Sequence, residues 1–392
     1  MRNRIIDILL ISLFVTMIGL GVVSPLLPLY AESFEATGLW LGIMFAAFSF
    51  SRMIFMPYFG KLSDKYGRKI FIAAGLLLYS MVSLFYAMAN SLFALTLIRT
   101  IHGLASAMVM PIAMAYIGDI SKKGKEGSMM GLTNSAIFLG LASGPFLGGF
   151  LMGSFGLPAV FLVISVLSGL TFLLTLFFLP EEKAEMTEDV VKKEMSYREM
   201  LYNSIVVGTL IFRLVNTMGR GILLSFLPLF AAFKLGLNAA QIGIIVSANI
   251  FLTAILQGAL GGLSDRFNKA DLIVGGSSVC ALSLVLMGLA TDFWQLLMLS
   301  SVMGIASAIA IPAATAFMVV VGKKTVMGEA MGLFSTSMSA GMVLAPIIAG
   351  FTDDHFGIGA VFGVAGVLVL MGTLIFYYFI QKGLRVKILA ID

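Results

Sequence analysis

Repeated apolar runs of about 20–25 residues constrain this chain more than any other feature of its sequence. A helix of that length crosses a hydrocarbon core about 30 Å thick, so lipid must be the solvent for most of the chain. Only 11% of the residues are charged while 59% are hydrophobic, which leaves too few charges for a water-soluble surface. We therefore expect an all-α membrane protein with twelve transmembrane helices, not a membrane β-barrel, whose strands would alternate over about ten residues. The expected spans are 5–29, 40–59, 70–89, 92–117, 128–153, 158–179, 202–232, 240–260, 272–290, 293–321, 327–351 and 359–381.

The lysines and arginines are distributed unevenly between the two sides of these spans. Of the 25, four fall inside spans, one (Lys234) falls in an odd-numbered connection, and the other 20 fall at the termini or in even-numbered connections. The positive-inside rule therefore predicts that both termini are cytoplasmic and that the chain lies in the cell inner membrane. The net charge of +5 follows from the same distribution, so it does not indicate a nucleic-acid partner.

The two halves of the chain repeat each other. The sequence GKLSDKY at 60–66 returns 201 residues later as GGLSDRF at 261–267, and six further glycines and prolines return at the same offset. We expect two pseudo-symmetric six-helix bundles, 1–179 and 201–392, joined by a charged cytoplasmic linker at 180–200. Transporters built from such parallel repeats usually hold their substrate between the halves and rock the halves for alternating access.

The segment GKLSDKYGRK at 60–69, between the second and third spans, resembles the signature loop of the major facilitator superfamily. In that family the loop latches the outward-facing state at the cytoplasmic mouth of the transporter. The resemblance implies that Asp64 lies near the end of span eleven and that Arg68 pairs with an acid at the end of span four, here Asp119. The residues implied in the latch are Gly60, Asp64, Gly67, Arg68, Asp119 and, from the repeat, Asp265.

The second copy of this loop departs from the family pattern. It keeps Asp265, but Asn268 and Lys269 stand where the first copy has glycine and arginine, and Val320 stands at the position equivalent to Asp119. Only the first latch is therefore expected to be complete.

Span five carries a glycine pattern that resembles the motif of exporters in the same superfamily. Its residues are Gly140, Gly144, Pro145, Gly148 and Gly149. Glycines at four-residue spacing form a bare stripe against which a neighbouring helix can approach closely, and the proline bends the span. The alternative interpretation of the stripe is ordinary tight helix packing.

Two further patterns extend the resemblance over the whole chain. Gly19 followed by Pro25 and Pro28 in span one resembles a signature of the twelve-span drug:proton antiporters. Arg99 and Gly103 in span four resemble a motif of the superfamily whose arginine faces the cavity and is tied to proton coupling. The resemblance implies the major facilitator fold and proton-coupled export of small amphipathic compounds.

Polar side chains in the middle of spans predict where a substrate binds. An arginine at a helix centre costs about 2.5–3.5 kcal/mol on insertion scales, so such residues normally line water or pair with a partner. On span seven, Arg213, Asn216, Thr217 and Arg220 share one helix face, because they follow the spacing i, i+3, i+4 and i+7. The expected cavity residues are Arg52, Arg99, His102, Arg213, Asn216, Arg220, Asn249 and Gln257. The alternatives are arginines bonded to polar groups at helix kinks and a histidine that serves only in packing.

No acidic residue lies deep within any expected span. Drug-cation exporters of the superfamily usually carry a buried acid in the first half, so the sequence departs from them here. An electropositive cavity would instead accept an anionic or zwitterionic substrate, with arginine as a clamp for carboxylate or phosphate. An organic-anion or zwitterion carrier is therefore the alternative to a multidrug exporter.

Other classes of protein fit the sequence poorly. The chain has two histidines and one cysteine, too few for the nucleophile or metal clusters of a membrane enzyme, and it has no phosphate-binding G-x-x-x-x-G-K-[ST] loop. We expect no enzymatic activity, cofactor or metal. The expected partners are a small-molecule substrate, protons as coupling ion and the lipid bilayer, with the chain acting as a monomer.

Overall fold

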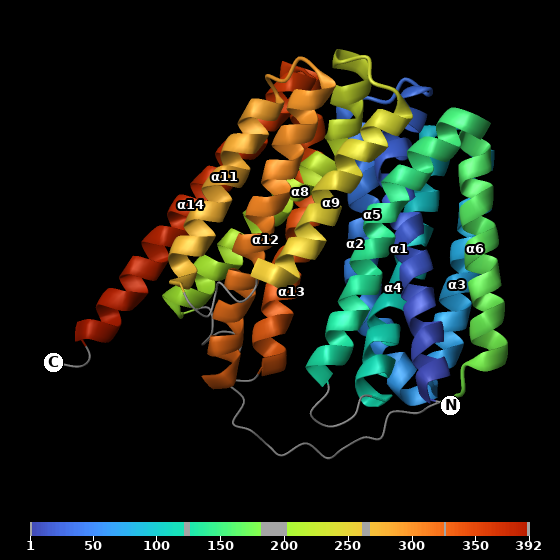
Figure 1. Ribbon diagram of the computed structural model, residues 1–392, viewed down its shortest axis with the longest axis horizontal. Helices are drawn as coiled ribbons and strands as arrows, with labels where there is room; N and C mark the ends of the chain where they lie inside the picture. The colour runs from blue at the N-terminus through green and yellow to red at the C-terminus, as the bar shows by residue number, and fades with distance from the viewer. Residues whose placement is uncertain (1, 121–125, 182–201, 261–266, 325–326, 390–392) are drawn as a thin grey trace. The chain divides into compact units, whose positions relative to one another are not determined.

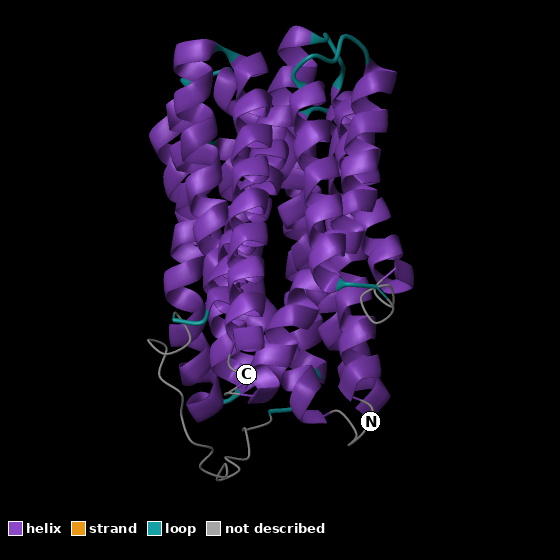
Figure 2. Cartoon of the chain, turned by 90° about the vertical axis from the view of Figure 1, so that its left-hand side faces the viewer, coloured by secondary structure: helices purple, strands orange, loops and turns teal. Residues whose placement is uncertain are grey.

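Helices account for all of the regular structure in the described part of the chain (Figure 2). The computed structural model describes residues 2–120, 126–181, 202–260, 267–324 and 327–389. Within these ranges, twelve helices are long and apolar enough to cross a membrane. The expected all-α fold and its twelve spans are therefore confirmed.

The helices group into two compact units (Figure 1). The first unit contains the first six helices together with residues 228–251, and the second contains residues up to 227 and from 252 onward in the second half. The first six helices are α1 (Arg2–Glu32), α2 (Gly38–Tyr66), α3 (Arg68–Met88), α4 (Leu92–Ile120), α5 (Glu126–Phe155) and α6 (Leu157–Phe178). The others are α8 (Ser204–Leu229), the π-helix η1 (Phe230–Lys234), α9 (Ala239–Leu260), α11 (Lys269–Met287), α12 (Phe293–Lys324), α13 (Met327–Phe356) and α14 (Ile358–Leu389).

Two helices in the second half, α8 and α9, are each divided between the units. The division in α8 falls at Pro228, which cannot donate a backbone hydrogen bond and is followed by the π-helical turn η1. The expected linker at 180–200 lies outside the described residues except for its first two positions. The expected boundaries of the two six-helix bundles stay a prediction.

The polarity of α6 is inverted relative to a helix of a water-soluble protein. Its buried face carries Ser165, Ser168, Thr171 and Thr175, whereas residues such as Leu162, Val166 and Phe177 are exposed. Three of these hydroxyl groups have partners: Thr171 donates to the carbonyl oxygen of Leu167, Ser165 lies 3.2 Å from the Ser80 hydroxyl, and Thr175 lies 3.4 Å from the Ser12 hydroxyl. An apolar outer face with a hydroxyl-lined inner face suits a helix whose solvent is lipid.

The internal repeat is visible in helix packing. In the first unit a Cβ atom on Gly75 of α3 would lie 3.1 Å from the carbonyl oxygen of Ala105 in α4. In the second unit a Cβ atom on Gly276 of α11 would lie 2.8 Å from the carbonyl oxygen of Ala306 in α12. Both the glycine and its partner are displaced by 201 residues, so the same backbone approach is built twice. The sequence repeat therefore corresponds to a repeat of three-dimensional contacts.

The turn before the last helix of each half of the chain also repeats. Gly156 precedes α6 and Gly357 precedes α14, and both have φ of +79°. This left-handed region favours glycine because it has no Cβ atom. The chain thus reverses direction at equivalent points of the two copies.

Candidate functional site

The expected ion pair of the signature loop is present. A guanidinium nitrogen of Arg68 lies 2.7 Å from a carboxylate oxygen of Asp119. Arg68 is the first residue of α3 and Asp119 lies in the last turn of α4, so the cation sits at the N-terminus of its own helix and the anion at the C-terminus of its own helix. Each charge alone is unfavourable for the dipole of its own helix, and the ion pair compensates for both placements. The pair therefore ties α3 to α4 at one end of the first unit.

The other residues of the expected latch are only partly described. Gly67 separates α2 from α3 with φ of +101°, as a sharp turn requires, and a Cβ atom on Gly60 would meet no atom within 4 Å. The side chain of Asp64 and the whole of Asp265 lie outside the described residues. Their role in a latch stays a prediction.

The glycines of α5 face two different helices. Gly140, Gly144 and Gly148 lie against α1, and a Cβ atom on Gly144 would come within 2.6 Å of the Ile18 carbonyl oxygen and of the Gly21 Cα atom. Gly149 lies against the backbone of Ala239 at the start of α9. Pro145, the remaining residue of the pattern, lies inside α5, and its carbonyl oxygen faces Gly243 of α9. The glycines Gly140, Gly144 and Gly148 thus let the backbone of α1 pack closely against α5, and the two helices lie side by side (Figure 1).

Arg99 is buried among aromatic rings. Its side chain is 3% exposed, and its guanidinium carbon lies 4.5 Å from the ring centroid of Phe48 and 5.1 Å from that of Phe45. The faces of these rings carry partial negative charge, which attracts a cation. Within the described residues no carboxylate pairs with Arg99, and its Nε and Nη1 atoms have no hydrogen-bond partner.

His102, one turn further along α4, is fully enclosed. Its Nδ1 atom lies 3.1 Å from the hydroxyl oxygen of Tyr86, and its ring meets that of Tyr79 edge-on at 4.4 Å between centroids. The Nε2 atom has no partner in the described structure. Tyr86 also reaches Arg99, so one phenol connects the histidine with the arginine.

We expect Tyr86→Phe to destabilise the first unit, because it removes the hydroxyl shared by His102 and Arg99. A buried polar group that loses its partner costs about 1–3 kcal/mol, so the melting temperature in detergent should fall by several degrees. Tyr378→Phe is the control, since Tyr378 is 62% exposed. Equal melting temperatures for both variants would mean that the phenol does not hold this cluster together.

Arg52 and Arg213 each donate a hydrogen bond to a methionine thioether. A terminal nitrogen of Arg52 lies 2.7 Å from the sulfur of Met110, and that of Arg213 lies 2.8 Å from the sulfur of Met338. A thioether is a weak acceptor, and the Nε atoms of both arginines are buried without a partner. These two cations therefore have most of their donor capacity unused in the described structure.

The expected polar face of α8 is only partly satisfied. Thr217 donates its hydroxyl to the carbonyl oxygen of Arg213, whereas the side-chain oxygen of Asn216 is buried without a partner. Arg220, two turns from Arg213, lies near the thiol of Cys280 on α11. The repeat explains the room for this arginine. Arg220 and Cys280 correspond, 201 residues earlier, to Gly19 and Tyr79, which pack against each other in the first unit. A large and a small side chain have exchanged places between the copies.

The expected polar stripe of α9 has mixed surroundings. Asn249 is buried and Gln257 is half-buried, while Thr253 between them donates its hydroxyl to the carbonyl oxygen of Gly304. Thr253 therefore serves helix packing in the second unit. Asn249 falls within the first unit and Gln257 within the second, so their expected meeting in one cavity stays a prediction.

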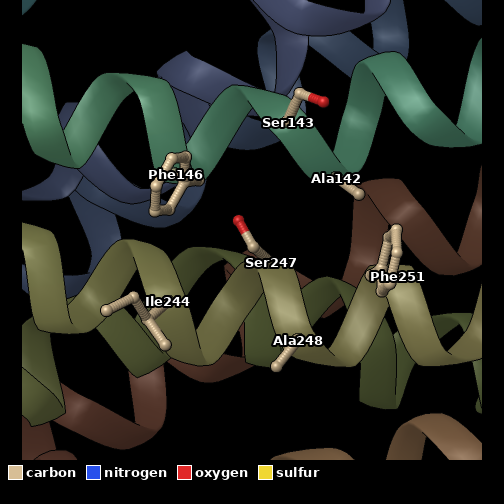
Figure 3. Close-up of a pocket in the computed structure, with 7 residues that line it drawn as sticks. All are labelled: Ala142, Ser143, Phe146, Ile244, Ser247, Ala248 and Phe251. Carbon is tan, nitrogen blue, oxygen red and sulfur yellow. The ribbon is translucent and has the colours of Figure 1, made fainter.

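A pocket of about 370 Å³ lies between α5 and the first half of α9, inside the first unit (Figure 3). It is lined by Ala142, Ser143, Phe146, Ile244, Ser247, Ala248 and Phe251. The hydroxyl of Ser247 points toward α5, and its oxygen has no hydrogen-bond partner (Figure 3). Apart from Ser143 and Ser247 the lining residues are apolar, so the pocket suits the apolar part of an amphipathic molecule.

Sequence reasoning did not identify the aromatic and thioether partners of the arginines or the pocket residues. Phenylalanine, tyrosine and methionine are frequent in any membrane helix, so Phe48, Tyr86 or Met338 carries no signal of its own. The usable signal was the absence of intramembrane acids, which requires that the arginines be accommodated by something other than carboxylates. The partner could then be sought only with the helices in place.

Comparisons with known proteins agree with the fold and the sequence patterns. The family model described as Major Facilitator Superfamily matches residues 9–215 and 209–389. An uncharacterized MFS-type transporter of Methanocaldococcus jannaschii is 30% identical over 376 residues, covering 95% of this chain and 97% of the relative. The quinolone resistance protein NorA of Staphylococcus aureus is 29% identical over 378 residues, covering 94% and 96%.

Solved structures show the same fold. A bacterial homolog to the human lysosomal transporter Spinster superposes with a TM-score of 0.83 at 14% identity and covers 98% of both chains. The human organic anion transporter MFSD10 superposes with a TM-score of 0.65 at 18% identity, covering 96% of this chain and 99% of that one.

Proposed function

The chain belongs to the Major Facilitator Superfamily, and from this membership we propose that it exports small amphipathic compounds in exchange for protons, by alternating access. The observation that carries the proposal is the α1–α5 crossing, in which the exporter-type glycines of α5 receive the α1 backbone. The quinolone resistance protein NorA, similar over nearly the whole chain, supports a drug-like substrate. The apolar pocket with its Ser247 hydroxyl supports an amphipathic one.

The proposal includes a definite arrangement in the membrane. Both termini and the segment 180–200 are cytoplasmic, because 20 of the 25 basic residues fall on that side under the positive-inside rule. The chain works as a monomer of two bundles, 1–179 and 201–392, that alternates between two conformational states. The Arg68–Asp119 pair acts on that side as a latch for one of the two states.

A second candidate function is transport of organic anions or zwitterions. The observation that favours it is that Arg52, Arg99, Arg213 and Arg220 form no ion pair with a carboxylate in the described part of the chain. Uncompensated buried cations are unfavourable, and a substrate carboxylate would compensate them. On this alternative the arginines are the clamp for the substrate.

Transport in proteoliposomes distinguishes these functions. A gradient of two pH units is worth about 2.7 kcal/mol per proton, so one-for-one exchange can sustain about a hundredfold gradient of a neutral substrate. We expect ethidium, a cationic dye, to be transported when the gradient is imposed and to stop when a protonophore is added. Liposomes without protein are the control.

The same assay with 2-naphthoate tests the alternative. Anion transport without ethidium transport, or transport that ignores the pH gradient, would replace the exporter proposal by the anion carrier. Absence of transport for every cationic, neutral and anionic compound would contradict both.

A further inference from the structure

We propose that α8 and α13 of the second unit form a binding site for an aromatic carboxylate that also carries an O–H or N–H donor. In this site Arg213 binds the carboxylate, Asn216 accepts the donor hydrogen, and Met338 lies along the aromatic ring. The inference rests on the proposed transport function and names a substrate class for it. All of the residues lie within the second unit.

The first step of the argument is the state of Arg213. Its guanidinium lies between the sulfur of Met338, 2.8 Å away, and the ring of Phe334, whose centroid is 4.8 Å from the guanidinium carbon. Neither group is a strong acceptor, and the buried Nε atom has no partner. A guanidinium presents five donors in a planar fork that matches a carboxylate, and such charge-assisted pairs are much stronger than a bond to sulfur. A carboxylate would therefore displace the thioether.

The second step is the neighbouring acceptor. Asn216 is 3% exposed and lies one turn from Arg213 on the same helix face, with about 5–6 Å between Cβ atoms at this spacing. Its side-chain oxygen is buried without a partner. Thr217, the polar residue that follows Asn216, has already donated its hydroxyl to the backbone. A ligand that fills this face must accept from Arg213 and donate to Asn216.

The third step is the aromatic character of the ligand. Once the carboxylate takes the guanidinium, the Met338 side chain loses its hydrogen-bond donor and is left as an apolar, polarizable surface. Sulfur of methionine makes favourable contacts with aromatic ring edges, and a flexible thioether adapts to rings of different shape. An aromatic ring attached to the carboxylate would therefore pack against the Met338 thioether that the carboxylate displaces from Arg213.

The fourth step separates this site from the scaffold. The crossing that holds α8 against α13 has a counterpart in the first unit. A Cβ atom on Gly341 would lie 2.5 Å from the Leu214 carbonyl oxygen, and one on the equivalent Gly140 would meet the carbonyl oxygen of Phe14, one residue beyond the position equivalent to Leu214. The site residues are not repeated. Arg213, Asn216, Phe334 and Met338 correspond, 201 residues earlier, to Ser12, Val15, Thr133 and Ile137. The first copy keeps the crossing without the cation, the amide, the ring or the thioether.

The test uses the full-length protein in detergent and measures the fluorescence of 6-hydroxy-2-naphthoate as it binds. The neutral amide 6-hydroxy-2-naphthamide and the hydroxyl-free 2-naphthoate are the comparison ligands. We expect the hydroxynaphthoate to bind at least about tenfold more tightly than its amide, as a charge-assisted bidentate pair implies. Equal affinities for the acid and the amide would overturn the proposal.

Variants assign the binding to these residues. Arg213→Gln should weaken binding of 6-hydroxy-2-naphthoate about tenfold and leave the amide unchanged. Asn216→Leu should weaken binding of 6-hydroxy-2-naphthoate and leave the affinity for 2-naphthoate unchanged. Arg4→Gln is the control, because Arg4 is an exposed arginine at the start of α1 in the first unit and is not one of the expected cavity residues. Equal losses of 6-hydroxy-2-naphthoate binding in Arg4→Gln and Arg213→Gln would overturn the assignment to α8 and α13.

Two further measurements keep the outcomes separable. If Arg213→Gln does not fold, Arg213→Lys is used instead, because lysine keeps the charge without the planar fork and should still weaken binding of the acid relative to binding of the amide. An unchanged ratio of the two affinities would contradict the proposal. Ethidium transport is measured in the same preparation. Dye transport with no preference for the acid rejects this site and leaves the exporter function standing, whereas acid binding without any transport rejects the function and leaves the site.

Discussion

Replacing Gly144 by valine should remove nearly all correctly folded protein. A Cβ atom at this position would lie 2.6 Å from the carbonyl oxygen of Ile18 and from the Cα atom of Gly21, both of which are backbone atoms of α1. Backbone cannot rotate away as a side chain can, so α1 and α5 would have to separate along their whole contact. Overpacking a well-packed site costs about 1–3 kcal/mol, and a backbone collision belongs at or above the top of that range. The yield of monodisperse protein in size-exclusion chromatography and the melting temperature measure the effect.

Gly153→Val is the matched control for this prediction. Gly153 lies on the same helix, and a Cβ atom there would meet no atom within 4 Å. We expect it to behave like the unmodified protein. Similar yields for Gly144→Val and Gly153→Val would show that the α1–α5 crossing tolerates separation and does not define the first unit.

Removing the carboxylate of Asp119 should lower both stability and transport. Asp119→Asn leaves the 5% exposed Arg68 at the start of α3 without its 2.7 Å anionic partner. Breaking a buried pair costs about 3–5 kcal/mol, but the Asp119 side chain is 41% exposed, so about 1–3 kcal/mol is expected here. If the pair also latches one conformational state, ethidium transport should fall by about tenfold, which corresponds to a shift of 1.4 kcal/mol between states.

Charge exchange makes this prediction specific. In the double variant Arg68→Asp with Asp119→Arg the pair is kept, and each charge then sits at the favourable end of its own helix. We expect the double variant to recover most of the melting temperature lost by Asp119→Asn. Asp7→Asn, which neutralises an exposed acid on α1, should change neither quantity. A double variant no better than Asp119→Asn would mean that the interaction is not a simple ion pair.

Much of the architecture could be predicted from the sequence because lipid imposes simple rules on the chain. A span must be apolar over its whole length, so the twelve helices were readable as runs without any knowledge of tertiary contacts. The repeat was readable because glycine and proline positions mark backbone geometry, and the matching turns at Gly156 and Gly357 show that geometry directly. The Arg68–Asp119 pair followed from the family resemblance.

The surroundings of the buried arginines could not be predicted in the same way. A uniformly apolar helix gives no indication of which face meets which neighbour, so the rings around Arg99 come from α2 at positions that look like lipid-facing phenylalanines. The thioether under Arg213 belongs to α13, 125 residues away. Such partners depend on helix rotation, which the apolar runs do not encode.

The exchange of arginines for small residues between the two copies also bears on how the chain enters the membrane during synthesis. The helix α1 carries Ser12 and Gly19 where its copy α8 carries Arg213 and Arg220, and α1 is the more apolar of the two. At about 2.5–3.5 kcal/mol for each central arginine, α8 is poorly suited to partition into lipid alone. The translocon can therefore release α1 early, whereas α8 depends on the companion helices of its own half to shelter its two charges. Insertion of α8 is then cooperative with the other helices of its half, whereas α1 can enter the membrane alone.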